Sequence, residues 1–517
     1  MADTKREIER KYESDTDGLP DLTRVPGVAS VHDRGVTHLD ATYHDTADER
    51  LAASAVTLRH RTGGSDAGWH LKFPVAPGVR DEIRAPLSDT LPAELAALVR
   101  SRVRHHPLLP VVRLRSDRDV RHLLDTDGRL LAEVSIDTVH AERLTGDGGT
   151  ARWTEIEVEL ADDGDPAFLD KVDKRLRKAG ARPARSSSKL ARALAETAPP
   201  GTPPPAPAPE AAPKQKRRSR AVGEPVTAGD HVLAYVRAQR DALVELDPAV
   251  RQDLPDAVHS MRVATRRLRS TFRTFRTVLD RETTDPVATD LKWLAGELGL
   301  DRDQEVLAAR LDAGLADLPP DLVHGPVAGR LTHWAEARHA GAHGRLTGIL
   351  DSHRYLTLLD TLDALVGDPP LRKKAGAAPE KVLTKAVRKD LDKLTGLVTR
   401  ALDLPPGTDR DVALHEARKK AKRTRYAAEA ATPALGKPAK RLVASMKSLQ
   451  GLLGDHQDSV MARRTLRELA AVAHAAGENA FTYGVLHARE ERRAELAESA
   501  LPDAWDAITG DHRPWTA

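Results

Sequence analysis

The pentapeptide EIERK, residues 7–11, decides the fold of the N-terminal part of the chain. Successive side chains of a β-strand point to opposite faces, so Glu7, Glu9 and Lys11 share one face and Ile8 takes the other. Charged alternation in one strand is ordinary for an antiparallel sheet with one solvated face. The pattern gains meaning only where several strands repeat it.

Several short segments of the first 160 residues do repeat this two-residue period. Each segment gathers charged side chains on one face. They are Arg59 and Arg61 in VTLRHR, Lys72 in WHLKF, Arg113 and Arg115 in VVRLR, Glu133 and Asp137 in LAEVSID, and Glu155, Glu157 and Glu159 in TEIEVEL, where Ile156 and Val158 face the opposite layer. If the sheet closes with these faces inward, carboxylates and cations meet in a lumen suited to a polyanion and its metal ions.

Length and composition divide the chain into parts. A chain of 517 residues is too long for one compact core, and a Pro/Ala-rich, basic stretch at 198–224 predicts a linker between domains 1–197 and 225–517. The absence of cysteine excludes disulfides, thiolate nucleophiles and zinc–sulfur sites. Aromatic residues make up only 3% of the chain, which argues against stacking platforms for nucleic-acid bases. No signal peptide or membrane-length apolar run is evident, so we expect a cytoplasmic protein.

After the linker, apolar residues recur every three or four positions, which predicts an all-helical region. The segment HSMRVATRRLR, residues 259–269, reappears as HEARKKAKRTR, residues 415–425. A second pair of matching segments, LGLDRD at 298–303 and LGDHQD at 453–458, follows each copy at nearly equal distance. A duplicated helical bundle explains both matches.

Helical spacing places the repeated basic residues along one side of each helix. The two sets are His259, Arg262, Arg266 and Arg269 in the first copy, and His415, Arg418, Lys422 and Arg425 in the second. No acidic residue occurs between positions 257 and 279, so the like charges favour a polyanionic partner. A single such helix is equally compatible with a solvated basic face. We expect Asp303 and Asp458 to orient the cations rather than to bind metal.

The N-terminal motifs resemble those of CYTH domains, the triphosphate tunnel metalloenzymes. EIERK is similar to the family's ExExK signature, and TYHDTADERLAASAVTLRHR, residues 42–61, is similar to its segment ending in LRxR. The resemblance implies an eight-stranded antiparallel tunnel barrel with flanking helices that hydrolyses a triphosphate with Mg²⁺ or Mn²⁺. It implies catalytic residues Glu7, Glu9 and Lys11; metal ligands Glu7, Glu9, Asp137, Glu155, Glu157 and Glu159; and phosphate-binding residues Lys11, Arg59, Arg61, Lys72, Arg84, Arg113, Arg115 and Lys189.

The helical region resembles the CHAD domain, the conserved-histidine α-helical domain. The resemblance implies two pseudo-symmetric four-helix bundles that bind inorganic polyphosphate through the two stripes, and a location at polyphosphate granules. Together, the domains predict a triphosphatase coupled to a polyphosphate-binding module, with no membrane and no nucleic acid as partner. Two alternatives stay open: a non-catalytic polyphosphate-targeting protein, and a nucleotide cyclase of the adenylate cyclase type.

Overall fold

The computed structural model describes residues 3–13, 18–146, 148–199, 225–339 and 341–511. The chain divides into two compact units, Met1–Arg218 and Ser219–Ala517. Residues 200–224 of the predicted linker lie outside the described residues. Each unit is therefore considered by itself.

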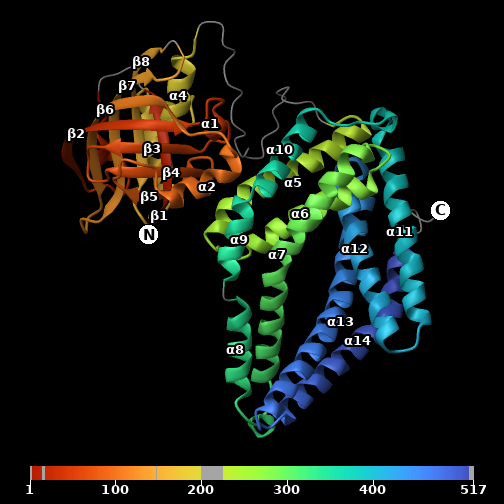
Figure 1. Ribbon diagram of the computed structural model, residues 1–517. Helices are drawn as coiled ribbons and strands as arrows, with labels where there is room; N and C mark the ends of the chain where they lie inside the picture. Colours follow the sequence, from red (N-terminus) through yellow and green to blue (C-terminus); the bar gives the residue numbers. More distant parts are fainter. Residues whose placement is uncertain (1–2, 14–17, 147, 200–224, 340, 512–517) are drawn as a thin grey trace. The chain divides into compact units, whose positions relative to one another are not determined.

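Eight antiparallel strands of the first unit close into a barrel (Figure 1). The strands are β1 (Asp3–Glu13), β2 (Ser30–Asp45), β3 (Thr57–Thr62), β4 (Gly68–Ala76), β5 (Val79–Pro86), β6 (Leu109–Leu124), β7 (Leu130–Arg143) and β8 (Thr150–Leu160). The order is β5-β4-β3-β2-β6-β7-β8-β1, and β1 pairs with both β8 and β5, which closes the ring. A ninth, two-residue strand, β9 (Arg182–Pro183), pairs with the end of β1. The predicted eight-stranded antiparallel barrel is confirmed.

Apolar side chains of the strands pack outward against helices, which leaves the charged faces inside. Helix α3 (Ala167–Lys178) covers β1, β7 and β8, and its Val172 packs in one core with Ile156 and Val158. The predicted apolar layer over those two residues is confirmed. Helices α1 (Arg50–Ala53) and α2 (Ala93–Val103) cover β3–β5 around a core that includes Leu58 and Leu71.

Helix α4 (Lys189–Glu196) closes one end of the barrel lumen. Its Leu190 and Leu194 pack against Leu114 and Trp153, which belong to the inward faces of β6 and β8. The Ser188 side chain caps the helix by accepting a hydrogen bond from the Ala191 backbone N–H. Packing and cap together fix the first residue of the helix, Lys189, at the lumen.

The second unit is helical and repeats its order of helices (Figure 1). The helices are α5 (Ala228–Arg251), α6 (Ala257–Thr274), α7 (Arg281–Ala316), α8 (Val327–His339), α9 (Ala342–Asp351), α10 (His353–Gly367), α11 (Pro379–Asp403), α12 (Thr408–Leu435), α13 (Lys437–Ala475) and α14 (Phe481–Asp511). In each repeat, a helix of about 25 residues precedes the histidine-bearing helix, and a helix of more than 35 residues follows it. The predicted duplication is therefore visible in the structure.

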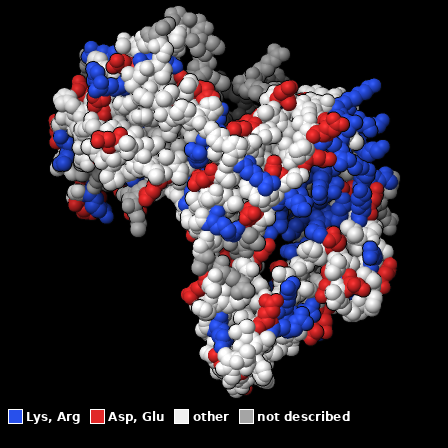
Figure 2. Space-filling model, viewed as in Figure 1, with Lys and Arg blue, Asp and Glu red and all other residues white. Residues whose placement is uncertain are grey.

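The two repeats share one large apolar core. It draws on α5, α6 and α10 of the first repeat and on α11, α12 and α13 of the second. A smaller core at the far end joins α7 and α8 to α13 and α14. Lys and Arg side chains gather over α6 and α12 (Figure 2). None of the helices in the described ranges is long and apolar enough to cross a membrane.

Candidate functional site

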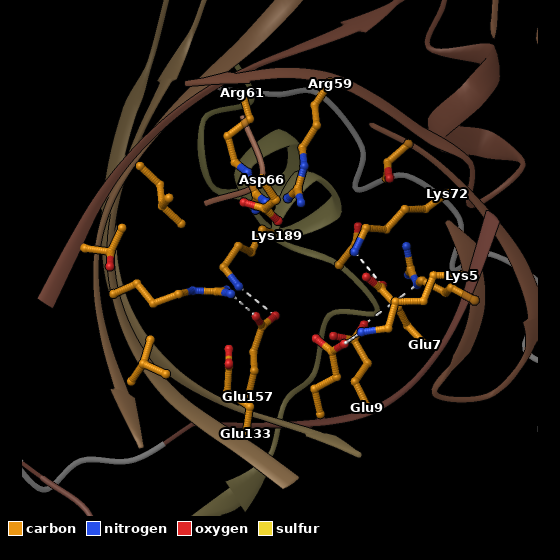
Figure 3. Close-up of a pocket in the computed structure, with 18 of the residues that line it drawn as sticks. Lys5, Glu7, Glu9, Arg59, Arg61, Asp66, Lys72, Glu133, Glu157 and Lys189 are labelled. Atoms are coloured by element: carbon orange, nitrogen blue, oxygen red, sulfur yellow. Dashed lines mark hydrogen bonds and ion pairs between the residues drawn. The ribbon is translucent and has the colours of Figure 1, made fainter. Parts of the chain in front are cut away.

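The barrel encloses a cavity of about 530 Å³ lined mainly by charged side chains. Arg59 and Arg61 extend into it from one side, opposite Glu9 and Glu157 (Figure 3). The predicted residues that line it are Glu7, Glu9, Lys11, Arg59, Arg61, Lys72, Arg84, Glu157, Glu159 and Lys189. Five of the eight strands, together with the start of α4, contribute these side chains.

A buried cluster of three carboxylates lies next to α4. Oxygens of Asp137, Glu155 and Glu157 lie within 4.8 Å of one another. The Lys189 ammonium sits among them, 3.0, 2.8 and 2.6 Å from these three carboxylates respectively. Lys189 is therefore held on the acidic side of the cavity, where the resemblance had implied a phosphate contact.

Arg118 completes this acidic cluster, although the sequence analysis did not identify it. Its guanidinium donates to both oxygens of Asp137 at 2.7 and 2.8 Å and to Glu157 at 2.7 Å. Burial raises the pKa of Glu157, but Lys11, Lys189 and Arg118 outweigh it and hold that pKa well below its usual value. The carboxylate is therefore ionised and ready to act as an oxygen ligand.

A second acidic group, Glu7 and Glu82, lies on β1 and β5. Lys72 Nζ lies 2.5 Å from Glu7 Oε2 and 3.2 Å from Glu82 Oε1. His70 Nδ1 lies 2.8 Å from Glu82 Oε1, and this contact orients the Glu82 carboxylate. Burial raises the pKa of Glu7 in spite of the attraction of Lys72, and it lowers the pKa of His70 to about 4.

The remaining predicted residues of β1, β5 and β8 form a chain of contacts along the lumen. Lys11 Nζ lies 2.5 Å from Glu157 and 3.3 Å from Glu9. Glu159 pairs with Lys5 at 3.0 Å, and Arg84 pairs with Glu82. Lys5, Arg80 and Arg118 also line the cavity and were missed in the sequence analysis. Lys5 continues the two-residue alternation of Glu7, and Arg80 that of Arg84, so this pattern could have identified both. The facing of Arg118 depends on the register of β6.

Arg59 and Arg61 form the cationic side. Arg59 donates to the Tyr43 hydroxyl at 3.3 Å, and Arg61 pairs with Asp66. Burial, followed by the charges of Arg59 and Arg118, lowers the pKa of Arg61 to about 9. The Nε atoms of Arg59 and Arg61 are buried and have no hydrogen-bond acceptor among the described residues. Such crowded, partly unsatisfied donors suit an anion with several oxygens.

The structure corrects the expected placement of Arg113 and Arg115. Both side chains point out of the barrel: Arg113 forms a bidentate pair with Asp40 at 2.9 and 2.5 Å, and Arg115 lies 3.6 Å from Glu142. Strand β6 turns its even-numbered residues inward, so Arg118 takes the place expected for them. A pattern of alternating arginines identifies a shared face but not which face is inside.

The carboxylates fit a divalent metal ion of the Mg²⁺ or Mn²⁺ type. Such ions prefer oxygen ligands, and Asp137, Glu155 and Glu157 offer three buried carboxylate oxygens close together. The Lys189 ammonium lies among these oxygens and balances part of their negative charge. Glu155 also accepts a hydrogen bond from Trp153 Nε1 at 2.7 Å, which orients it. The remaining predicted ligands, Glu7, Glu9 and Glu159, lie on neighbouring strands β1 and β8.

In the helical unit, the stripes lie on helices α6 and α12, which pack against each other, and each stripe contacts the helix that follows it in its own repeat. Arg262 donates to both oxygens of Asp303 at 2.7 and 2.9 Å. Its counterpart Arg418 lies 3.9 Å from Asp458. The expectation that these acids orient the stripe is therefore met closely in the first repeat and more loosely in the second.

Two glycines at equivalent positions make room for these arginines. A Cβ atom on Gly299 would lie 3.0 Å from Arg262 Nη2, and one on Gly454 would lie 3.3 Å from Arg418 Nη2. Both glycines belong to the repeated LG segments. The matching segments thus supply, in each repeat, a surface on which a guanidinium can lie.

The cations of the two stripes influence each other. Burial, followed by the charges of Arg418, Arg266 and Arg262, lowers the pKa of Lys422 to about 7. Burial and nearby cations also lower the pKa of Arg266 and of His415. His259 is exposed, whereas the other stripe residues are half-buried.

One acid, Glu429, holds the last residue of the second stripe, Arg425, and Arg267, which lies beside the first stripe. Arg425 Nε lies 3.2 Å from Glu429, which also accepts from Arg267 Nε at 3.0 Å. Arg269, by contrast, lies half-buried beside Arg273, and its own burial, followed by the charge of Arg273, lowers the pKa of Arg269. The Nε atoms of Arg262 and Arg418 are buried and lack an acceptor among the described residues. The surface therefore holds more hydrogen-bond donors than its own acids satisfy.

A closed barrel with this lumen, followed by a duplicated helical unit with two histidine-bearing basic stripes, defines a CYTH domain joined to a CHAD domain. The CYTH domain family matches residues 5–193, and the CHAD domain family matches residues 234–467. The chain belongs to the family of proteins that combine the two. CYTH domains are typically triphosphate tunnel enzymes that depend on a metal, which implies a triphosphate substrate.

Two curated proteins are similar to this chain over nearly its whole length, and two solved structures are similar to part of it. Two from Mycobacterium tuberculosis, uncharacterized protein MT2285 of strain CDC 1551 / Oshkosh and uncharacterized protein Rv2226 of strain ATCC 25618 / H37Rv, are each 39% identical over 515 residues, or 96% of this chain and 95% of theirs. PptA from Streptomyces chartreusis is 26% identical, with a TM-score of 0.46, over 55% of this chain and 100% of that chain. The CHAD domain from the plant Ricinus communis is 22% identical, with a TM-score of 0.42, over 58% and 97%.

Proposed function

We propose that the barrel hydrolyses a short triphosphate with a divalent metal ion and that the helical unit binds inorganic polyphosphate. The observation that carries the proposal is the division of one cavity into two sides. Carboxylates of β1, β7 and β8 lie on one side and the guanidinium groups of Arg59 and Arg61 lie on the other. A chain of phosphates with bound metal carries the matching charges.

The residues have separate tasks in this proposal. Asp137, Glu155 and Glu157 would hold the metal, which neutralises phosphoryl oxygens and activates water when it is bound. Arg59 and Arg61 would grip the phosphate chain and stabilise charge that develops on its oxygens. Lys72 and Lys11, already paired with Glu7 and Glu157, would orient the reacting end of the chain.

The helical unit would hold the longer polymer. Its stripes concentrate cations whose burial and mutual repulsion lower their pKa values, and a polyanion relieves that repulsion. A retained polymer places the protein where phosphate chains are plentiful, including polyphosphate granules. The cytoplasmic location expected from the sequence agrees with this role.

Metal-dependent release of phosphate tests the enzymatic half. Tripolyphosphate, long-chain polyphosphate, thiamine triphosphate and ATP are each incubated with the full chain and Mg²⁺ or Mn²⁺, and the products are identified. We expect phosphate release from tripolyphosphate that stops with a chelator. Release from none of the four refutes hydrolysis and favours the targeting protein, whereas cyclic nucleotide and pyrophosphate from ATP favour the cyclase.

Retention of polyphosphate tests the other half. Replacing Arg266 and Lys422 together by Gln removes two central charges of the stripes, and we expect polyphosphate of every length to bind at least tenfold more weakly. Binding that falls steeply with added salt supports direct phosphate contacts. Affinity independent of salt and of this double substitution refutes the proposed surface.

A further inference from the structure

Helix α11 carries a row of four exposed lysines, Lys381, Lys385, Lys389 and Lys393, which we call the lysine ridge. The spacing of four residues places them on one side of the helix, about 6 Å apart along its axis. Like charges at this spacing repel each other. In the described part of the chain, no acidic side chain forms an ion pair with any of the four.

The acid nearest the centre of the ridge does not neutralise it. The ridge contains one exposed acid, Asp392, against four lysines, and its other acid, Asp390, is only 2% exposed. Its carboxylate accepts a hydrogen bond from the Thr274 hydroxyl at 2.6 Å and pairs with Lys420 and, at 3.3 Å, with Arg423. The acid therefore joins α11 to α6 and α12 and leaves the outward charges unbalanced.

Arg423, one of the partners of Asp390, connects the ridge to the stripes. Arg423 of α12 reaches across to donate from Nη2 to the Arg273 carbonyl at 3.3 Å, and Arg273 is the next cation of α6 after the stripe residue Arg269. On the other side, Lys393 lies close enough to Lys420 to disfavour its charge. Figure 2 shows a broad area of Lys and Arg side chains on one face of the helical unit, with a few Asp and Glu side chains among them.

The chemistry of α11 selects one kind of partner. The helix contains no aromatic residue on which a base could stack, and none of its large apolar residues is exposed to enter a membrane. What remains is a line of ammonium groups that can contact phosphate oxygens. A polymer that presents only phosphates fits this surface better than a nucleic acid or a lipid surface.

We propose that the lysine ridge is a second binding segment for polyphosphate, engaged only by chains long enough to continue past the stripes of α6 and α12. The inference rests on the proposed binding of polyphosphate to those stripes. The stripes alone contact all the phosphates of a short chain. Longer chains pass Arg273 and Arg423 and reach the ridge, so the helical unit distinguishes polymers by length.

The triple variant K385Q/K389Q/K393Q tests the ridge. We expect the full chain carrying it to bind long-chain polyphosphate about tenfold more weakly and short oligophosphate with unchanged affinity. The slope of log affinity against log salt for the long polymer should decrease by about 2, because three contacts at about 0.7 each are lost. The matched control is K171Q/K174Q/K178Q, which removes three exposed lysines from α3 of the barrel unit.

The outcomes separate the two proposals. The ridge proposal is overturned if the triple variant and the wild type bind long chains equally. It is also overturned if the α3 control loses as much affinity as the triple variant, or if the triple variant loses as much affinity for short chains as for long ones. A loss confined to duplex DNA, with polyphosphate binding intact, also overturns it. Failure of the stripe variant R266Q/K422Q to weaken any chain instead refutes the binding on which the ridge depends. Circular dichroism and thermal unfolding check that each variant is folded.

Discussion

The Lys189 ammonium lies 2.6 Å from a carboxylate oxygen of Glu157, so a cation supplied by α4 is bound by an acid supplied by β8. The contact is buried, and both partners line the cavity. A divalent cation and this ammonium would compete for the same oxygens. Occupation by metal would thus free Lys189 to contact a phosphate, the role implied by the family resemblance.

Substitution of Lys189 by Met should expose this competition. Asp137, Glu155 and Glu157 then lose a shared buried partner, and the metal-free protein should be less stable by about 3–5 kcal/mol. Mn²⁺ should raise the unfolding temperature of the variant more than that of the wild type, because the metal replaces the lost charge. Thermal unfolding with a chelator and with Mn²⁺ measures both. An equal rise in variant and wild type would show that no metal binds at this cluster.

Substitution of Glu9 or Glu7 by Gln should abolish metal-dependent phosphate release from tripolyphosphate, with a loss of about 100-fold or more. Glu7 is 4% exposed, and both residues line the cavity. The matched control is Asp81→Asn, since Asp81 pairs with Arg6 on the outer face at 2.8 Å. Full activity in both glutamine variants would remove these residues from the catalytic set.

The inward arginine of β6 should matter more than the outward ones. Arg118→Gln removes the bidentate donor of Asp137 and one hydrogen bond to Glu157, and we expect activity to decrease at least tenfold. Arg113→Gln and Arg115→Gln should change activity by less than about twofold, since both side chains lie outside the barrel. Comparison of kcat/KM among the three variants decides which face of β6 serves the site.

Polyphosphate binding should depend on pH through Lys422. Its pKa is about 7 in the free protein, where it faces Arg418 of its own helix, Arg262 and Arg266 of α6, and Asp303 of α7. A bound polyanion raises that pKa, so binding takes up a proton above pH 7. Affinity should be constant below about pH 7 and decrease by at most tenfold per pH unit above it.

The variant Lys422→Arg provides the control for this effect. Arginine stays charged over this range. The affinity of the variant for polyphosphate should therefore change less than that of the wild type between about pH 7 and pH 9. Calorimetry in buffers of different ionisation enthalpy measures the proton uptake directly. Equal pH dependence in the variant and the wild type would exclude Lys422 as the titrating group.

Substitution of Gly299 by Ala should weaken polyphosphate binding through Arg262. The new Cβ would lie 3.0 Å from the guanidinium and displace it from Asp303. We expect affinity to decrease about three- to tenfold, a loss of ~1 kcal/mol. Gly296→Ala, on the same helix with open space at its Cβ, should leave affinity unchanged. Equal effects of the two substitutions would argue against a positioning role for Gly299.

Much of this organisation was predictable because local periodicity encodes it. Alternation in EIERK and TEIEVEL correctly placed Glu7, Glu9, Glu157 and Glu159 on one face, since a strand repeats every two residues whatever surrounds it. The spacing of the two histidine segments likewise predicted the repeat, because helical pitch is a local property.

The sequence alone therefore determined the two domains, their classes and the composition of each charged face. The tertiary structure alone decided which face of β6 is inside, and so replaced Arg113 and Arg115 with Arg118. It also placed Lys189 among three carboxylates and turned Asp390 away from the lysine ridge. The physical reason is that facing and pairing depend on register and packing between segments distant in sequence, whereas alternation and pitch are set within each segment.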